Sequence, residues 1–572
     1  MWLWVMLLVL ASECYGCLEH ERVALLQLKA SSIKHSNVLP TWVEAWEGET
    51  TTDCCKWERV ECNATTGRVI QLSLNSAENY FSWNSRDWYL NASMFLPFEE
   101  LESLDLSYNG LAGWLENEGF ERLHVLGKLE LLDLSHNSFN NGIVPSLGVL
   151  SSLKTLNLRS NNLNGSIDIG GKLELLRLDW NSFNNSILPS LGVLSSLKTL
   201  SLHGNLLNGS IDIGEFHNMS NLEELDLSTN HIDSIKGLKS LSKLKMLNLQ
   251  WNELKGLVSS NGEIPVQLCQ LKQLSILDLS KNNFSGPIPL CFREIPFETT
   301  HEKSSLEIGY QESFTFALWR FVEGSKSLED HYPVDIAYES ISFHSLDVQQ
   351  KVEFTTKHGS YAYKGNILDY MSGVDLSCNH LTGEIPLEMG NLSNIRDLNL
   401  SHNNLFGSIP STFSQLKQIE SLDLSYNRLN GKIPSQLIEL DKLEVFSVAY
   451  NNLSGVIPDQ KAQFATFEES SYEGNPLLCG FPLQTNCNKT VPTSTMSKGL
   501  DIEIEDGGFI DMEVFYVSFL VSYIIVLLGI VAILFINPHW RQAWFHLVEM
   551  WMTSWYYFFL DSFMKFFCIR SM

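Results

Sequence analysis

Basic residues are scarce in this sequence. Its 572 residues include 39 Lys and Arg against 66 Asp and Glu, which gives a formal net charge of -27. Nucleic-acid binding requires clusters of Lys and Arg against the phosphates, and no basic run occurs. The composition therefore excludes a nucleic-acid partner.

Metal-ligand spacings are also missing, because no His stands at a zinc-finger distance from a pair of cysteines. We expect no metal and no other cofactor. The cysteines cluster instead at the two ends of a repeat region, which indicates disulfides in an extracellular protein. Adjacent Cys54 and Cys55 each need a partner of their own. The pairs that we favour are Cys17 with Cys54, Cys55 with Cys62, and Cys479 with Cys487.

Cys269 and Cys291 lie one turn of the repeat apart. Two interpretations stay open for them, a bridge between adjacent turns or a pair of buried thiols. Cys378 is left over and is expected to remain a thiol.

Two segments carry targeting signals. Residues 1–16 are apolar and end in small residues, which predicts a signal peptide even though Lys and Arg are missing from it. Residues 514–536 contain no charged side chain and suffice to cross a hydrocarbon layer of about 30 Å as a helix. Acidic residues precede this span, and Arg541, Lys565 and Arg570 follow it. The N-terminal side is therefore predicted to be extracellular.

Glycosylation acceptors agree with this orientation. Asn-x-Ser/Thr triplets occur on the N-terminal side of the span and none occurs after it. The predicted acceptors are Asn63, Asn91, Asn164, Asn184, Asn208, Asn218, Asn283, Asn391, Asn399, Asn452 and Asn488.

A leucine pattern, L-x-x-L-x-L-x-x-N-x-L-x-G, repeats between the cysteine clusters and is clear at Leu101–Gly113. Its L-x-L core predicts a short strand with leucines inward and the intervening residues on an open concave face. The Asn can bond backbone groups inside the turn, and a later Gly-x-Ile-Pro supplies a bend. Since no single turn closes a core, the turns must stack. The expected fold is an α/β solenoid, a superhelix with short parallel strands on its concave face.

Sealing segments flank the stack. Residues 17–29 predict an amphipathic helix before Cys54, Cys55 and Cys62, and residues 472–480 lead to Cys487. These caps, the N-x-L-x-G-x-I-P repeat, the span and the short tail resemble a plant leucine-rich-repeat receptor-like protein over nearly the whole chain. The resemblance implies signalling through an adaptor receptor kinase and a co-receptor kinase that docks on the last four repeats.

One insertion interrupts the repeats between Asn282 and Asn379. The four pattern asparagines from Asn379 to Asn451 step by 24 residues, so the interval before them is far longer than one repeat. It is rich in aromatic residues, unlike a solvated linker. The resembled family has an island at this place with four repeats after it, and Lys351–Tyr370 resembles its return strand. Elsewhere, residues 145–156 are copied at 189–200, which indicates duplication of two turns.

The predicted organisation has nine segments. They are a signal peptide 1–16, an N-terminal cap 17–66, a first repeat block 67–291, an island insertion 292–369, a second repeat block 370–459, a C-terminal cap 460–490, an acidic juxtamembrane segment 491–513, a transmembrane helix 514–536 and a cytoplasmic tail 537–572.

Departures from the repeat pattern mark a candidate ligand surface, because Arg and Trp are favoured at binding centres. The candidate residues are Arg159, Arg177, Asp179, Trp180, His203, Gln250 and Trp251. A plainer interpretation of the two tryptophans is that they cover neighbouring leucines or contact a glycan. His203 has no catalytic arrangement beside it and is interpreted as a surface histidine.

No enzyme is predicted. The 36 residues after Ile536 contain no phosphate loop and no His-Arg-Asp motif, and the insertion offers no nucleophile with a matched base. The sequence favours a plasma-membrane receptor-like protein that binds an extracellular peptide, protein or glycan and serves plant defence. The alternatives are a wall-associated inhibitor or decoy that binds a microbial wall-degrading enzyme, and a developmental peptide receptor subunit.

Overall fold

A computed structural model describes residues 17–32, 53–75, 88–115, 126–170, 172–216, 218–255, 262–297, 351–356, 359–364, 371–485 and 487. All of them belong to one compact unit, Met1–Glu302 with Glu339–Cys487. The predicted signal peptide, juxtamembrane segment, span and tail lie outside the described residues. Within the described residues, no helix has the length and apolarity that a membrane crossing needs.

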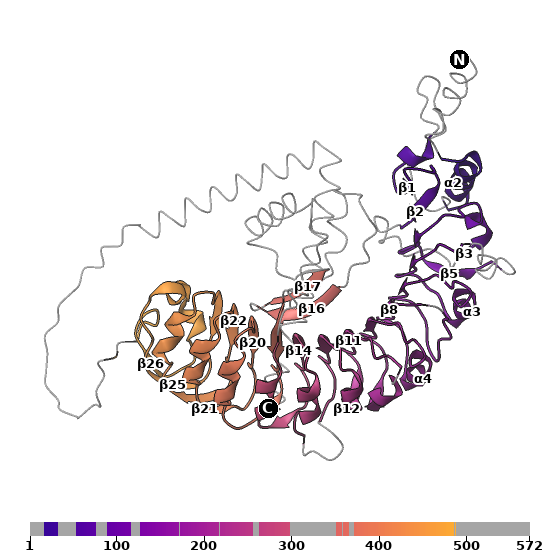
Figure 1. Ribbon diagram of the computed structural model, residues 1–572. Coiled ribbons are helices and arrows are strands. Elements are labelled where there is room, and N and C mark those ends of the chain that lie inside the picture. The colour runs from indigo at the N-terminus through magenta and orange to yellow at the C-terminus, as the bar shows by residue number, and fades with distance from the viewer. Residues whose placement is uncertain are drawn as a thin grey trace, which may run out of the picture. The chain divides into compact units, whose positions relative to one another are not determined.

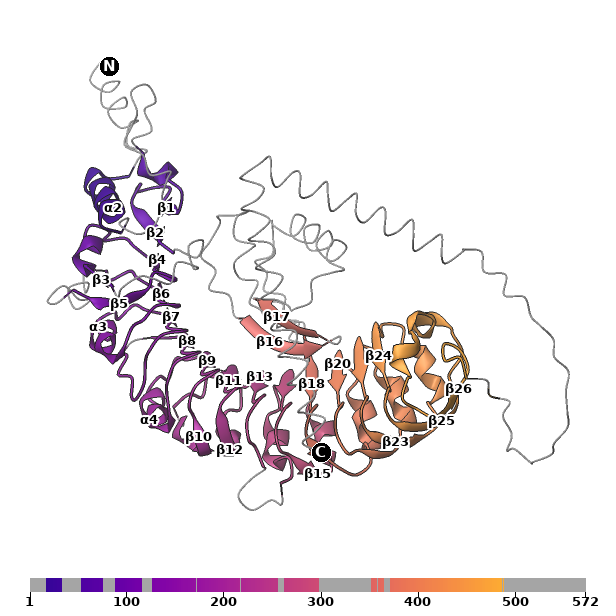
Figure 2. The same ribbon diagram turned by 180° about the vertical axis from the view of Figure 1, so that it is seen from behind.

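Short strands form a 14-stranded sheet along the inner side of the repeat unit (Figures 1 and 2). Only β1 is antiparallel to its neighbour, and every later pair is parallel. The strands, in spatial order, are β1 Val60–Cys62, β2 Val69–Ser73, β4 Ser103–Asp105, β6 Leu131–Asp133, β7 Thr155–Asn157, β8 Leu175–Arg177, β9 Thr199–Ser201, β11 Glu224–Asp226, β13 Met246–Asn248, β14 Ile276–Asp278, β18 Gly373–Asp375, β20 Asp397–Asn399, β22 Ser421–Asp423 and β24 Val445–Ser447. This sheet confirms the predicted solenoid.

One apolar residue of each inner strand, in register with its equivalents on the neighbouring strands, points into one shared core. From β2 to β24 these residues are Leu72, Leu104, Leu132, Leu156, Leu176, Leu200, Leu225, Leu247, Leu277, Val374, Leu398, Leu422 and Phe446, each at most 1% exposed. A fully buried Leu contributes roughly 1.5–3 kcal/mol. Because every turn contributes such a residue to the same interior, the turns cannot fold separately.

An asparagine ladder runs beside this core. Asn403 Nδ2 donates to the carbonyls of Leu376, Leu400 and Ser401 at 3.0–3.2 Å, and its Oδ1 accepts from the Leu381 N–H at 3.0 Å. The same contacts recur along the stack, as predicted. The ladder asparagines are Asn109, Asn137, Asn161, Asn181, Asn205, Asn230, Asn252, Asn282, Asn379, Asn403, Asn427, Asn451 and Asn475. Asn475, in the C-terminal cap, was missed by the sequence pattern.

Short helices and minor strands form the remaining sides of each turn. The α-helices are α2 Glu19–Ser32, α3 Val144–Leu147 and α4 Leu188–Leu191, and the 3-10 helices are η1 Cys54–Lys56, η3 Ala92–Phe95, η5 Asn141–Ile143, η6 Asn185–Ile187, η7 Ile213–Phe216, η8 Leu238–Ser240, η9 Val266–Gln270, η10 Leu290–Glu294, η13 Leu387–Asn391, η14 Ser411–Gln415, η15 Ser435–Glu439, η16 Ala462–Thr466 and η17 Glu469–Ser471. The minor strands are β3 Trp88–Leu90, β5 Leu111–Trp114, β10 Asn208–Asp212, β12 His231–Lys236, β15 Ser285–Gly286, β19 His380–Leu381, β21 Phe406–Ser408, β23 Arg428–Gly431, β25 Asn452–Val456 and β26 Leu477–Cys479. The two copies of the duplicated segment fold alike, one as α3 followed by β7 and the other as α4 followed by β9.

The insertion leaves the stack unbroken. Strand β14 pairs directly with β18, and the Asn379 amide reaches back to the Leu279 carbonyl at 3.0 Å. Helix η10 completes the turn of β14, and Ile295 and Phe297 are 0% exposed in its core. The expected boundary at residue 292 therefore falls inside a repeat. The expected return strand is a two-stranded antiparallel hairpin, β16 Lys351–Thr356 with β17 Gly359–Lys364.

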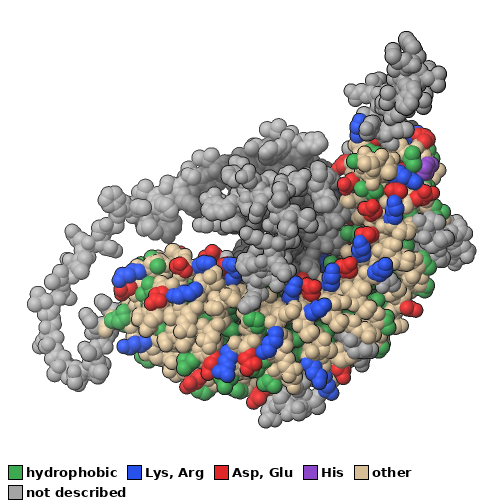
Figure 3. Space-filling model, viewed as in Figure 1, with side chains coloured by type: hydrophobic (Ala, Val, Ile, Leu, Met, Phe, Trp, Pro, Cys, Tyr) green, Lys and Arg blue, Asp and Glu red, His purple; other side chains and the backbone are tan. Residues whose placement is uncertain are grey.

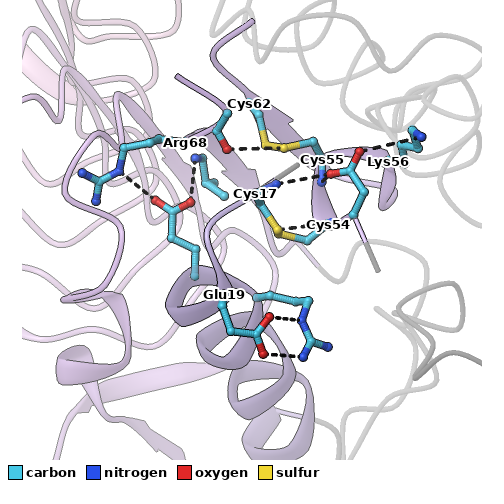
Figure 4. The surroundings of a disulfide bond; sticks show 12 residues. Cys17, Glu19, Cys54, Cys55, Lys56, Cys62 and Arg68 are labelled. Atoms are coloured by element: carbon cyan, nitrogen blue, oxygen red, sulfur yellow. Dashed lines mark hydrogen bonds and ion pairs between the residues drawn. A yellow bond between two sulfur atoms is a disulfide. The ribbon is translucent and has the colours of Figure 1, made fainter. Parts of the chain in front are cut away.

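Disulfides close both caps. Figure 4 shows Cys17 bonded to Cys54 and Cys55 bonded to Cys62 beside helix α2. At the other end Cys479 pairs with Cys487. A fourth bridge, Cys269–Cys291, joins η9 to η10 on adjacent turns, so the bridged interpretation is the one that the structure supports. Cys378 is half-buried and takes part in none of these four bridges.

A buried ion pair joins the N-terminal helix to the first repeat. Glu21 is 0% exposed, its Oε1 lies 3.3 Å from Arg68 Nε, and its Oε2 accepts from the Val69 N–H at 3.2 Å. Burial raises the pKa of Glu21 in spite of these partners. Arg68 also pairs with Glu99 at 3.1 Å, so one guanidinium links the cap to the first two turns.

Candidate functional site

One half-buried or exposed position recurs at the edge of the inner sheet, immediately before each ladder asparagine. We call it the rim column. Its members, in order along the stack, are Tyr108, His136, Ser160, Trp180, Gly204, Thr229, Trp251, Lys281, Cys378, His402, Tyr426, Tyr450 and Gly474. Each has a positive φ, between 51° and 72°. L-residues adopt this region rarely, so the repeat itself imposes this conformation and presents the side chain at the sheet edge.

The predicted ligand residues occupy three kinds of place. Arg177 ends strand β8 and is 9% exposed. Arg159, Asp179, His203 and Gln250 each stand two residues beyond an inner strand, where most later turns carry Ser. Trp180 and Trp251 belong to the rim column. Only one of the seven residues is therefore part of a strand.

The structure groups five of these residues and separates two. Arg159, Arg177, Asp179, Trp180 and His203 come from the adjacent turns of β7, β8 and β9. The expectation that all seven line neighbouring turns was too broad, because β11 pairs between β9 and β13. Gln250 and Trp251, on the turn of β13, form a second location.

Trp180 lies on a glycine. A Cβ built at Gly204, the next rim residue, would stand 2.8 Å from the indole ring. The His203 ring meets the indole edge-on at 5.0 Å between centroids, and His203 Nδ1 lies 2.7 Å from Ser228 Oγ. Trp180 is 48% exposed. Its ring therefore lies against the Gly204 backbone on the next turn, and its role in ligand binding stays a prediction.

Trp251 contacts the next rim residue differently. Lys281 Nζ lies 4.3 Å from the centroid of its ring, a cation–π contact. The indole is 42% exposed. The lysine thus occupies one side of the ring, and Trp251 offers less aromatic surface to a ligand than Trp180 does.

The sequence interpretation missed two aromatic stacks in the rim column. Tyr108 and His136 are parallel at 4.0 Å between ring centroids. In the second block, His402, Tyr426 and Tyr450 stack at 4.2 and 4.3 Å. The Tyr450 hydroxyl donates to Glu473 at 3.1 Å. Aligning the repeats on their asparagine and examining the residue before it would have found this column.

The opposite edge of the inner sheet carries charge. There, at the residue before each strand, Lys154 pairs with Glu130, Lys198 with Glu174, and Lys245 with Glu223, at 2.6–2.8 Å. Figure 3 shows acidic and basic side chains interspersed on the described surface of the face that it presents. Exposed pairs of this kind stabilise little and neutralise one another, so this edge is a poor candidate for charge-based recognition.

Carboxylates meet on the inner face at two places. Strand register sets Asp105 beside Asp133 and Asp278 beside Asp375. Burial, with Asp105 next to it, raises the pKa of Asp133 to about 6. Burial raises the pKa of Asp278 to about 6 and, with Asp278 adjacent, lifts the pKa of Asp375 well above its ordinary value. In the described part of the chain no group of residues could hold a metal ion.

The predicted glycosylation acceptors differ in exposure. Asn164, Asn184, Asn208, Asn218, Asn283, Asn391 and Asn452 are exposed, Asn63, Asn91 and Asn399 are half-buried, and Asn488 lies outside the described residues. Asn399 is the least suited, because it lies in strand β20 and its Oδ1 accepts from both the N–H and the hydroxyl of Ser401. The exposed acceptors remain predictions.

Family comparisons agree with this geometry. Leucine rich repeat models match residues 195–254, 371–429 and 393–453, with further single-repeat matches at 128–150 and 273–295. A leucine rich repeat N-terminal domain model matches residues 18–63, the cap with the two N-terminal disulfides. The chain is a leucine-rich-repeat protein similar to plant receptor-like proteins.

Relatives of this leucine-rich-repeat chain are much longer. Cuscuta receptor 1 of Solanum lycopersicum is 64% identical over 217 residues, which cover 38% of this chain and 19% of that protein. Receptor-like protein 14 of Arabidopsis thaliana is 39% identical over 300 residues, covering 50% and 28%. The chain thus spans about a fifth to just over a quarter of the length of these relatives. A crystal structure of a TDR receptor aligns with 68% of this chain and 50% of its own, at 24% identity and a TM-score of 0.42.

Proposed function

We propose that this protein is a cell-surface receptor-like protein that binds an extracellular peptide, protein or glycan through its repeats and signals through associated receptor kinases in plant defence. The observation that carries the proposal is the group of Arg159, Arg177, Asp179, Trp180 and His203 on three adjacent turns of the inner sheet. Charged groups and an exposed indole on a rigid sheet are typical of binding centres.

A second surface supports a role for a partner. His402, Tyr426 and Tyr450 form a stack on the turns after the insertion, and Tyr450 is 42% exposed. Tyrosine contributes large contact area with little side-chain entropy to lose. We assign this stack to the co-receptor kinase, which leaves the β7–β9 turns for the ligand. Attachment through the span at residues 514–536 belongs to the same proposal.

Purification of the tagged full-length protein from plant plasma membranes tests the signalling role. We expect a receptor kinase to copurify with the wild type and to be lost when residues 514–572 are removed. Replacement of both Arg177 and Trp180 by Ala should abolish the response to a ligand-containing extract and leave secretion and kinase association unchanged. A double mutant that responds like the wild type contradicts the assignment of the ligand surface.

The inhibitor alternative predicts the opposite result for the truncated chain. A wall-associated inhibitor acts by binding alone, so a secreted protein that ends before residue 514 would keep its full effect on a microbial wall-degrading enzyme. A receptor becomes silent under the same truncation. Comparing the full-length protein with the truncated protein therefore distinguishes the two functions.

A further inference from the structure

The rim column places small residues between large ones. From His136 the column continues through Ser160 to Trp180, then through Gly204 and Thr229 to Trp251. Backbone bonds show that these turns are consecutive, because the Ser160 N–H donates to the Asp179 carbonyl and the Trp180 N–H donates to the His203 carbonyl, both at 2.8 Å. Gly204 lies directly under one face of the Trp180 indole. The other neighbour of Trp180 in the column is only a serine.

Elsewhere in the column a ring occupies the equivalent place. Tyr108 with His136, His402 with Tyr426, and Tyr426 with Tyr450 stack at 4.0–4.3 Å between centroids on consecutive turns. Neighbouring strands lie about 4.8 Å apart, so His136 and Trp180, two turns apart, are separated by roughly 10 Å along the column. One flat ring over Ser160 would restore the spacing seen in the other stacks.

Two polar atoms beside Ser160 have no hydrogen-bond partner among the described residues. They are Arg159 Nε, a donor, and Asp179 Oδ1, an acceptor. Asp179 is 5% exposed, and an unsatisfied buried polar group costs free energy. Both residues stand one position before a rim residue, Arg159 before Ser160 and Asp179 before Trp180. A group that donates to Asp179 and accepts from Arg159 would satisfy both.

We infer that a phenolic ring of the extracellular ligand lies over Ser160 against the exposed face of Trp180, with its hydroxyl between Asp179 and Arg159. A phenol O–H donates one hydrogen bond and accepts another, and its ring stacks as the tyrosines of the column do. A ligand guanidinium would meet the charge of Arg159, and an indole N–H only donates. This inference rests on the proposed function and names the ligand chemistry of the same surface.

Ser160→Tyr tests the site directly, because it supplies the ring from within the chain. Tyr is compatible with this backbone, since Tyr108, Tyr426 and Tyr450 adopt φ of 58°, 52° and 54° where Ser160 has 53°. Thr229→Tyr is the matched control, because Thr229 is also a small rim residue at φ 53° and stands beside Trp251. The residue before it is Ser228, so the control site has no arginine–aspartate pair on its two turns.

The experiment uses the full-length chain in detergent and small probes observed by saturation-transfer NMR. N-acetyltyrosinamide should give ring signals that fall by about tenfold in S160Y and stay unchanged in T229Y, as expected for losing one stacked, hydrogen-bonded ring. N-acetylphenylalaninamide, which lacks the hydroxyl, should bind several-fold more weakly. Equal tyrosine signals from the wild type and S160Y would overturn the site.

Two further probes examine the ligand class. A signal from N-acetylargininamide or methyl glucoside that exceeds the tyrosine signal and disappears in S160Y would overturn the phenol assignment. Kinase copurification, measured on the wild type and on S160Y, separates this inference from the proposed function. A wild type that binds no phenol but keeps its kinase association rejects the inference alone, whereas a wild type without kinase association rejects the proposed function.

Discussion

The repeats before and after the insertion use the same architecture differently. After it, the ladder asparagines step by 24 residues, and Ser377, Ser401 and Ser425 occupy the second position beyond the strand. Before it, the steps range from 20 to 30 residues, and the same position carries Arg159, Asp179, His203 and Gln250 at four turns. The second block is regular where the first block varies.

The difference teaches which positions the fold constrains. In both blocks the strand centre is an apolar buried residue and the ladder Asn makes the same bonds. In the second block the Ser401 hydroxyl donates to the Asn399 side chain, at 2.7 Å from Oδ1. Arg159 and Asp179 instead leave polar atoms without partners. The first block therefore lacks internal hydrogen bonds at two atoms to which, in the proposed site, a ligand would bond.

The largest predicted effect tests what the two blocks share. Asn181→Ala in the first block and Asn403→Ala in the second each remove three donated bonds and one accepted bond. Each should lower the free energy of unfolding by roughly 3 kcal/mol, because buried backbone groups lose their partner. Chemical denaturation measures both losses. A much smaller loss for Asn181 would mean that the irregular block does not depend on the ladder.

The next largest effect is expected where the two blocks meet, at the pairing of β14 with β18. Asp278 has its Oδ2 without a partner among the described residues and lies beside Asp375. Because burial raises the folded pKa of Asp278 to about 6, its contribution to stability is complete below the unfolded pKa and is lost as the pH rises through the folded one.

Asp278→Asn should therefore stabilise the protein by roughly 2 kcal/mol at pH 7, and the gain should vanish below the unfolded pKa of about 3.9. Thermal unfolding measured across this pH range is the check. Asp423→Asn, in the second block, is the control without an adjacent carboxylate on either paired strand. A gain for D278N that does not change with pH would contradict the account.

A smaller effect distinguishes steric contact with the Trp180 ring from backbone strain at a positive φ. Gly204→Ala places a Cβ 2.8 Å from the Trp180 ring at φ +64°, whereas Gly209→Ala, at φ +60°, meets nothing within 4 Å. G209A should lower stability by about 1 kcal/mol through strain alone, and G204A by more. Adding Trp180→Leu to G204A should recover the excess. Failure to recover it in a double-mutant cycle would show that the indole does not rest on Gly204.

The smallest effect concerns the charged edge. Lys198 and Glu174 pair at 2.6 Å with side chains 53% and 42% exposed. Lys198→Gln should change stability by less than about 0.5 kcal/mol, and less still in high salt. Urea unfolding at two salt concentrations measures this. A large loss would show that the edge does more than keep the surface soluble.

The sequence alone identified most of the candidate site residues, but it did not show the rim column that two of them belong to. The departures at Arg159, Arg177, Asp179, Trp180 and His203 were visible because the repeat defines what is ordinary at each position. Their separation from Gln250 and Trp251 comes from the turn of β11, which stands between β9 and β13. The rim column was missed because the pattern treats the residue before Asn as variable, and only the left-handed backbone makes it one aligned surface.

The spacing of leucine and asparagine by itself determined that this chain is a solenoid, because each turn repeats local rules whose consequences add along one axis. The cysteine clusters at its two ends determined the disulfide caps. Tertiary structure alone decided that β14 pairs with β18 across the insertion, that Trp180 rests on Gly204, and that Asp278 meets Asp375. These contacts join different turns, and their geometry follows from the stacking of the turns, which no single repeat encodes.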